Sequence, residues 1–142
     1  MISRTEANKA AVRSYVTALN SGDWDRLRDL FAPGATIQGV TGSAPIERAL
    51  APGSVWHQLR DGLNMELIIE DLAAEGDRAA ALYTERGRWT GHYLNMGEPT
   101  GRVYELVAME WFELNSEGRI TRRWGARDSA AQARQLGFPR AA

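Results

Sequence analysis

The chain has 142 residues, which at roughly 100–200 residues per domain is enough for one domain and too few for two. It carries 17 lysine and arginine residues against 18 aspartate and glutamate residues, so its formal net charge is −1. This balance argues against a nucleic-acid-binding protein and against a polybasic membrane anchor. Cysteine is absent, which excludes disulfides, thiolate metal sites, iron–sulfur clusters and cysteine nucleophiles.

No segment of the sequence has the apolar character of a membrane anchor or a signal peptide. Residues 1–9 are polar, and no apolar run approaches the ~20 residues that a membrane-spanning helix needs. Hydrophobic residues make up 44% of the chain and charged residues 25%, a mixture typical of a globular domain. We therefore expect a cytoplasmic protein with neither a membrane nor a nucleic acid among its partners.

The first half of the chain has helical periodicity. The expected elements, in chain order, are a helix over 6–20, a short helix capped by Asp23, an extended segment over 35–40, a loop over 41–46 and a helix over 45–62 that is broken at Pro52-Gly53. In the last of these helices, the side chains expected to face inward are those of Val55, Trp56, Leu59 and Leu63.

The second half changes to the alternating pattern of strands. Strands are predicted over 64–73, 78–90, 102–114 and 118–128, and a final helix over 129–136. Helices followed by a meandering sheet form an α+β pattern, which differs from the alternating strands and helices of a dinucleotide-binding fold. The sequence also lacks a glycine-rich phosphate loop and a P-loop lysine.

Six short motifs spread over nearly the whole chain carry a family resemblance. They are Asn20 to Asp25, Phe31 to Ala35, Glu70 to Arg78, Pro99 to Arg102, Glu117 to Ile120 and Gln135 to Gly137. In this order and spacing, the chain resembles the SnoaL-like polyketide cyclases of the nuclear-transport-factor-2-like superfamily. The resemblance implies one SnoaL-like domain over residues 1–142. It further implies a cone-shaped, curved antiparallel sheet that packs on N-terminal helices around an apolar pocket (a cystatin-like α+β barrel), usually in homodimers.

The resemblance also implies a class of chemistry. The best-understood enzymes of the family close a ring by aldol condensation, using an acid/base residue and no metal or cofactor. We therefore expect a cofactor-independent cyclase or isomerase of polyketide-type biosynthesis that acts on a hydrophobic polycyclic substrate. The family's His-Trp-Asp stretch reads Arg123-Trp124-Gly125 here. The missing aspartate favours another reaction, such as isomerisation, dehydration or epoxide opening, or else a non-catalytic ligand-binding protein.

The turn at 115–118 predicts the register of the last two strands. If Leu114 faces Arg119, the pairing continues to Glu110 opposite Arg123. Side chains at alternate positions share a face, so the face matched to the family's pocket holds Leu106, Ala108, Glu110, Phe112, Arg123, Gly125 and Arg127. A carboxylate held beside a guanidinium among apolar side chains is a candidate general base. The alternative is a cross-strand salt bridge without a chemical role.

The opposite face of the same two strands is also apolar. It holds Val107, Met109, Trp111, Trp124 and Ala126. A half-exposed sheet of a monomer normally alternates between apolar and polar residues, so a second subunit is the natural cover and a homodimer is expected. The alternative is that both tryptophans pack within a single chain.

The remaining candidates complete the predicted site. The catalytic candidates are Glu110, Arg123 and Asp128, of which Asp128 is also a good N-cap for the helix over 129–136. The candidates for contact with a small hydrophobic substrate are Tyr15, Trp56, Tyr83, Trp89 and Arg127. A core aromatic is the simpler explanation of Tyr15, and the pattern of strand 78–90 leaves open which of its faces lines the pocket. His57 and His92 are too isolated to bind a metal, so no metal and no other cofactor is expected.

Overall fold

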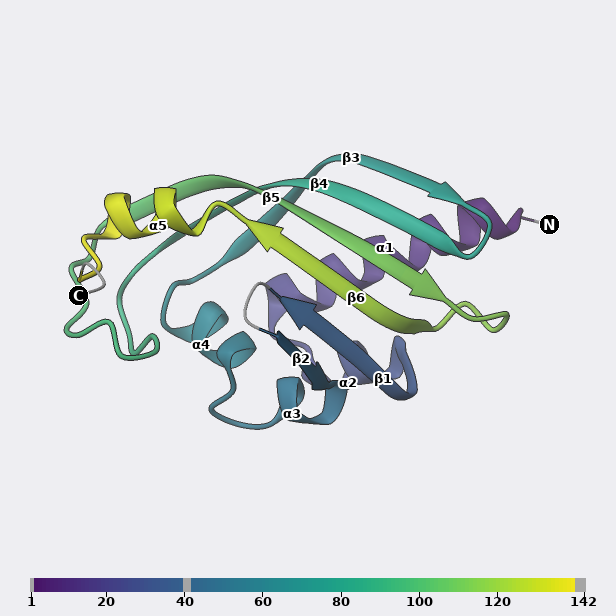
Figure 1. Ribbon diagram of the computed structural model, residues 1–142, viewed down its shortest axis with the longest axis horizontal. Helices are drawn as coiled ribbons and strands as arrows, with labels where there is room; N and C mark the ends of the chain where they lie inside the picture. The colour runs from purple at the N-terminus through teal and green to yellow at the C-terminus, as the bar shows by residue number, and fades with distance from the viewer. Residues whose placement is uncertain (1, 40–41, 140–142) are drawn as a thin grey trace.

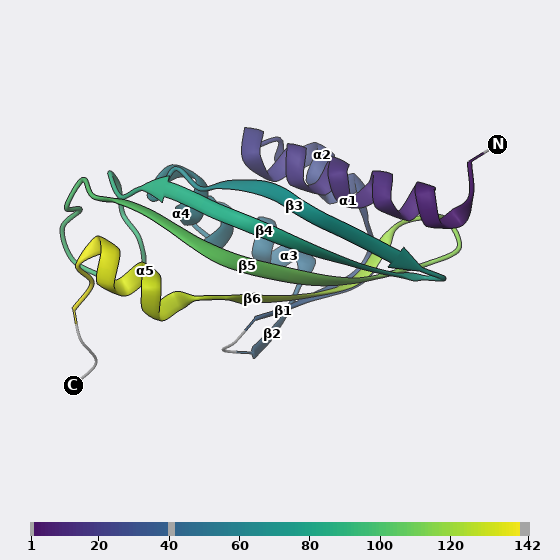
Figure 2. The ribbon, with the colours of Figure 1, turned by 90° about the horizontal axis from the view of Figure 1, so that it is seen from above.

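The computed structural model describes residues 2–39 and 42–139, and a long curved sheet dominates it (Figure 1). Its elements are α1 (Arg4–Ser21), α2 (Trp24–Asp29), β1 (Phe31–Gly39), β2 (Gly42–Pro45), α3 (Ile46–Leu50), α4 (Val55–Asp61), β3 (Glu66–Glu75), β4 (Arg78–Arg88), β5 (Val103–Leu114), β6 (Ile120–Arg127) and α5 (Ser129–Leu136). Figure 2 shows that α1 and α2 lie on one side of this sheet. The α+β class expected from the sequence is confirmed.

The sheet has six strands in the order β2-β1-β6-β5-β4-β3. Strands β3 to β6 form an antiparallel meander, as the turn signals predict. The segment predicted as an extended piece becomes β1, which pairs in parallel with β6. Strands from both halves of the chain therefore build one continuous concave surface.

Helix α1 is fixed to the sheet at its C-terminal end by Asn20. The helix starts at a Ser3 cap, whose hydroxyl accepts a hydrogen bond from the Glu6 amide at 3.1 Å, and it ends at Gly22 in the left-handed conformation. The Asn20 side chain accepts from the Leu67 amide at 2.8 Å and donates to the Leu67 carbonyl at 2.9 Å. These two bonds fix the position of α1 along β3.

Two local expectations in the first half are wrong. Residues 42–45 of the expected loop form β2, which pairs antiparallel with β1. The helix predicted over 45–62 is interrupted around Pro52-Gly53, as expected, and gives α3 and α4. Val55, expected to face inward, is instead 46% exposed, because it is the first residue of α4 after the Ser54 cap. Trp56, Leu59 and Leu63 are buried as predicted. Positions 40 and 41, which the expected extended segment and loop include, lie outside the described residues.

The predicted register of the β5–β6 hairpin is also wrong, by two residues. Glu110 pairs with Gly125, and Arg123 pairs with Phe112. The shift arises in the turn, where the Asn115 side chain accepts hydrogen bonds from two backbone amides, both at 3.0 Å, and a bulge follows Glu113. Because side chains alternate with a period of two, the shift leaves Glu110, Arg123, Gly125 and Arg127 on their predicted face. At the turn, beyond the bulge, Leu114 pairs with Ile120 in place of Arg119.

The convex face of the sheet exposes several large apolar side chains. Val103, Val107 and Met109 are all more than half exposed, and Trp111 is 39% exposed. Trp124 is half-buried, and the Arg122 guanidinium lies over its ring at 4.9 Å from the centroid. In the described part of the chain, no helix combines the length and the apolar composition needed to cross a membrane.

We predict that Asn20→Ala lowers the free energy of unfolding by about 1–3 kcal/mol, because it leaves the Leu67 amide and carbonyl without their partners. Urea denaturation measures the change. The matched control is the neighbouring Ser21→Ala, whose hydroxyl bonds only to carbonyls of α1 and whose removal should cost less than about 0.5 kcal/mol. Equal stability of the two variants would show that Asn20 does not fix the position of α1.

Candidate active site

The concave face of the sheet, α1 and α4 line a partly open cavity of about 790 Å³. Six of the sequence-predicted site residues line it, and they come from five different elements: Tyr15, Trp56, Tyr83, Glu110, Arg123 and Arg127. Most of the other lining side chains are apolar, including Leu59, Met65 and Leu67. The cavity therefore combines an apolar wall with a small number of polar and charged groups, which is the usual composition of a small-molecule site.

Glu110 is the central charged group of this cavity. Its Oε2 accepts a hydrogen bond from Arg123 Nη1 at 2.5 Å and another from the Tyr15 hydroxyl at 2.8 Å. The Glu110 and Arg123 side chains are each only 9% exposed. The other carboxylate oxygen, Oε1, is buried and has no hydrogen-bond partner among the described residues. One oxygen is thus held in place, while the other is buried without a partner among the described residues.

Tyr15 holds this carboxylate from the opposite layer. The spacing of Val12, Tyr15, Val16 and Leu19 on α1 places all four side chains in the core. The Tyr15 ring packs edge-on against Phe112 at 5.1 Å between centroids. Burial, and then the charge of Glu110, raise the pKa of Tyr15 well above 10, so its hydroxyl stays protonated and donates to Oε2.

Tyr83 supplies a second hydroxyl next to the same carboxylate. It lies on β4, is almost fully buried and lines the cavity, but its hydroxyl has no hydrogen-bond partner among the described residues. Burial, and then the charge of Glu110, raise the pKa of Tyr83 far above its ordinary value, so Tyr83 also remains a donor. A buried polar group without a partner costs about 1–3 kcal/mol. The Tyr83 hydroxyl and Glu110 Oε1 are therefore two neighbouring buried polar groups that the described residues leave without a hydrogen-bond partner.

Arg123 is enclosed by aromatic and acidic neighbours. Its guanidinium carbon lies 5.4 Å from the centre of the Trp56 ring, within the range of a cation–π contact. Burial works against the charge, but the oxygens of Tyr15 and Glu110 outweigh it and raise the pKa of Arg123. The guanidinium is thus permanently charged and held between Trp56 and Glu110.

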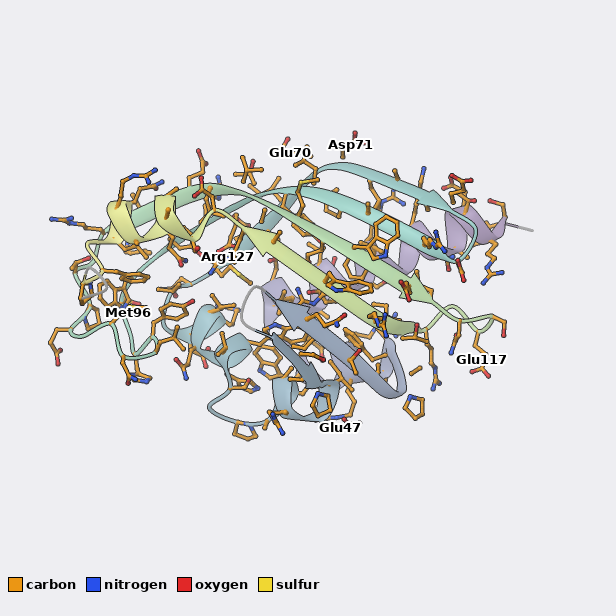
Figure 3. The ribbon with its side chains drawn as sticks, viewed as in Figure 1. Glu47, Glu70, Asp71, Met96, Glu117 and Arg127 are labelled. Carbon is orange, nitrogen blue, oxygen red and sulfur yellow. The ribbon has the colours of Figure 1, made fainter. Side chains whose placement is uncertain are left out.

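A second carboxylate–arginine pair lines the same cavity further along the sheet. Glu85 on β4 is 2% exposed and receives two hydrogen bonds from Arg127, of which that from Nε to Oε1 measures 3.0 Å. Tyr104 donates to Glu85 Oε2 at 2.6 Å, and Gln132 accepts from Arg127 Nη1 at 3.2 Å. Arg127 lies at the end of β6, just before α5, whereas Glu117 marks the β5–β6 turn at the other end of the hairpin (Figure 3).

Sequence reasoning missed part of this second cluster. Tyr104 shares the alternating face of Leu106 and Ala108, so extending that pattern by one step would have included it. Glu85 was not missed in the same sense, because it alternates with Tyr83 in the sequence; that pattern left the face open, and the structure shows that both residues line the cavity. Gln132 carries no signal in the sequence, because only the packing of α5 against β5 brings it to Arg127.

Two predicted site residues lie outside the cavity lining. Trp89 follows the end of β4, is fully buried against Phe138 and donates its ring N–H to the Gly91 carbonyl at 3.0 Å. Asp128 caps α5, where its carboxylate accepts from the Ala131 amide at 3.0 Å. These positions support neither a substrate contact for Trp89 nor a catalytic role for Asp128.

The histidines and carboxylates of the described residues form no metal-binding cluster of three or more side chains. His57 instead stacks on Trp24, with ring centres 4.0 Å apart, and its Nε2 lies 3.1 Å from the Leu50 carbonyl oxygen. The chemistry that this site offers is proton transfer by Glu110 together with hydrogen bonding by two tyrosine hydroxyls.

Comparison with protein families and solved structures identifies the family and the fold of this chain. The model of the SnoaL-like domain matches residues 12–123. The chain belongs to the SnoaL-like family. IdmH from Streptomyces antibioticus, a proposed polyketide cyclase, is 28% identical to this SnoaL-like chain and superimposes with a TM-score of 0.76 over 92% of this chain and 99% of that chain.

Two further structures share the fold of this SnoaL-like protein. A proposed SnoaL-like polyketide cyclase from Jannaschia sp. CCS1 is 21% identical and has a TM-score of 0.84 over 99% of either chain. An LEH-like epoxide hydrolase from M. tuberculosis is 16% identical and has a TM-score of 0.74 over 94% of this chain and 92% of that chain. The nuclear-transport-factor-2-like fold implied by the sequence motifs is thereby confirmed.

We predict that Tyr15, Tyr83 and Tyr104 stay protonated in the folded protein well above pH 10, the ordinary pKa of tyrosine, because burial raises the pKa of each. As the pH rises, the tyrosines of the unfolded chain lose their protons before those of the folded protein do. The free energy of unfolding that these protonated tyrosines contribute is therefore complete below about pH 10 and falls as the pH rises further. Ultraviolet absorbance of tyrosinate, recorded with circular dichroism, should show the three ionising only as the chain unfolds. Complete ionisation of all tyrosines in a chain with native circular dichroism would contradict this.

Proposed function

We propose that this SnoaL-like protein is a cofactor-independent acid/base enzyme that removes a proton beside a carbonyl group of a hydrophobic, polycyclic, polyketide-type substrate. The observation that carries the proposal is the buried Glu110 carboxylate, with one oxygen held by Arg123 and Tyr15 and the other unpaired in an apolar cavity. The structural neighbours described as proposed polyketide cyclases support the same general chemistry.

The proposed step transfers one proton and creates one enolate. Glu110 Oε1 takes the proton, the electrons of the C–H bond form the new carbon–carbon double bond, and the electrons of the carbonyl double bond move to its oxygen. Tyr83 donates a hydrogen bond to that developing oxyanion, which is where a fixed donor contributes most. Protonated Glu110 then returns the proton to the far carbon of an enolate that is conjugated with a second double bond, which completes an isomerisation. Alternatively, the enolate carbon attacks a second carbonyl, which closes a ring, and the resulting alkoxide takes the proton back from Glu110. Neither route needs an electron acceptor or a metal ion.

We expect Glu110→Gln to slow proton removal by about 100-fold or more, since the amide keeps the shape of the carboxylate but cannot accept the proton. The probe is β-tetralone, a bicyclic ketone, whose exchange of α-hydrogens in deuterium oxide is followed by mass spectrometry. The affinity for the ketone, measured by tryptophan fluorescence, should change much less, because Glu110 takes the proton only in the transition state and not in the bound ground state.

The matched control is Glu105→Gln, which removes an exposed carboxylate from the other face of the same strand and should leave the exchange rate unchanged. A folded Glu110→Gln variant with the wild-type exchange rate would overturn the proposed base.

Two alternative functions are each supported by a specific observation. Epoxide opening is favoured by the carboxylate–arginine pairs in the cavity and by the structural likeness to an LEH-like epoxide hydrolase. A non-catalytic binding protein is favoured by position 125, where glycine stands in place of the aspartate that the family resemblance implies. Hydrolysis of cyclohexene oxide without ketone exchange would favour the first, and saturable binding of β-tetralone without either reaction would favour the second.

We further propose that the protein is a homodimer whose subunits meet through the convex face of the sheet. The support is the exposed apolar surface of Val107, Met109 and Trp111, whose burial on association is favourable.

We predict that the wild-type chain sediments as a dimer at micromolar concentration and that Trp111→Glu sediments as a monomer or becomes insoluble, since the variant places a charge in the apolar contact. The control is Ile2→Glu, which changes an exposed apolar residue outside the sheet and should remain dimeric. A monomeric wild-type chain at micromolar concentration would rule out the homodimer.

A further inference from the structure

The Glu110–Arg123 ion pair runs diagonally across two strands. Glu110 faces Gly125, and Arg123 faces Phe112, so the two charged residues are not direct partners in the sheet. Diagonal neighbours on one face are separated by about 7–8 Å between Cα atoms, compared with about 4.5–5.5 Å for directly opposite residues. The Arg123 side chain therefore has to lie along β6 and pass over position 125 to reach Glu110 Oε2.

Gly125 leaves open the space that the Arg123 guanidinium fills. A Cβ atom at position 125 would collide with Arg123 Nη1, and it would lie 3.4 Å from Arg123 Cζ and 3.7 Å from Glu110 Oε2. Gly125 does not belong to the glycines with a positive φ, so its backbone is one that any residue adopts. The need for glycine here is steric and comes from the ion pair, not from the strand.

The guanidinium cannot move aside and keep its contact with Glu110. Arg123 is 8% exposed, the Trp56 ring lies against it, and Glu110 with Tyr15 occupies its other side. A side chain at position 125 would be accommodated by moving the flexible end of Arg123, which leaves the fold intact and breaks the contact with Glu110. The cost of such a substitution therefore falls on the arrangement of the site.

We propose that Gly125 is a positioning residue, whose lack of a side chain lets Arg123 cross β6 and orient Glu110 so that Oε1 remains free for the substrate. This inference rests on the proposed role of Glu110 as the base. Without Arg123 on Oε2, the carboxylate keeps only the Tyr15 hydroxyl and rotates about its last bonds. Proton removal then slows, whereas the apolar walls that bind the substrate are unchanged.

The contact itself is tested by NMR of the arginine side chains in the full-length protein, which requires no substrate. A guanidinium held in a buried ion pair gives resolved, slowly exchanging Nη–H signals, and Arg123→Lys identifies those of Arg123. We expect these signals in the wild-type chain and in Gly39→Ala, a control in which the added Cβ meets nothing within 4 Å. They should be lost in Gly125→Ala and in Glu110→Gln.

The effect on chemistry is tested with β-tetralone exchange. Gly125→Ala should lower the exchange rate by about 10-fold or more, because a small misplacement of a reacting group is costly, with little change in binding of the ketone. Arg123→Lys should partly rescue Gly125→Ala, since lysine ends where Cζ lies and has no atom at the position of Nη1. The melting temperature of the double variant should therefore exceed the value expected from adding the two single effects.

The outcomes separate this inference from the proposed function. Intact Arg123 signals together with an unchanged exchange rate in Gly125→Ala would overturn the positioning role. Additive melting temperatures in the double variant would equally overturn the steric argument. If the Arg123 signals disappear but Gly125→Ala and Glu110→Gln both exchange β-tetralone at the wild-type rate, the proposed base is overturned, and with it the positioning role that depends on it.

Discussion

The structure depends on keeping the Glu110 carboxylate inside an apolar cavity. Removing a charge from water costs several kcal/mol unless it is paired and hydrogen-bonded. The compensating groups come from two other elements, Arg123 from β6 and Tyr15 from α1. The site therefore exists only when the register of the β5–β6 hairpin and the position of α1 along the sheet are both correct. Asn115 in the turn and Asn20 at the end of α1 stabilise those two features.

The same pairing recurs along the concave face. Both carboxylates in the cavity wall, Glu85 and Glu110, are bound by an arginine of β6 and by a tyrosine hydroxyl. Arg123 and Arg127 lie four residues apart on one strand, so the two pairs occupy successive stretches of one surface. Pairing each carboxylate with a guanidinium balances its charge within the cavity wall, which is compatible with the hydrophobic substrate proposed above.

Strand alternation explains which parts of the site could be predicted from the sequence. The faces of Glu110, Arg123 and Arg127 follow from a period of two, and a register error of two residues does not change them. The cross-strand partner of each residue does not follow from this alternation, because the register depends on the hydrogen bonds of Asn115 in the turn. Trp89 lies one residue beyond the end of β4, where the alternation of the strand no longer applies. Gln132 depends on how α5 packs, and no local pattern encodes that.

Position 125 shows why a single residue of a motif is a weak guide to function in this fold. The family resemblance implies an aspartate there, and its replacement by glycine, considered alone, favours the loss of catalysis. In the sheet, however, Glu110 lies directly opposite, and its Oε2 is only 3.7 Å from where a Cβ of residue 125 would be. A carboxylate therefore occupies the same part of the cavity, supplied by β5 instead of β6. Arg123 takes the space that the missing side chain would need, so the absence of a side chain at position 125 and the Glu110–Arg123 ion pair belong to the same arrangement.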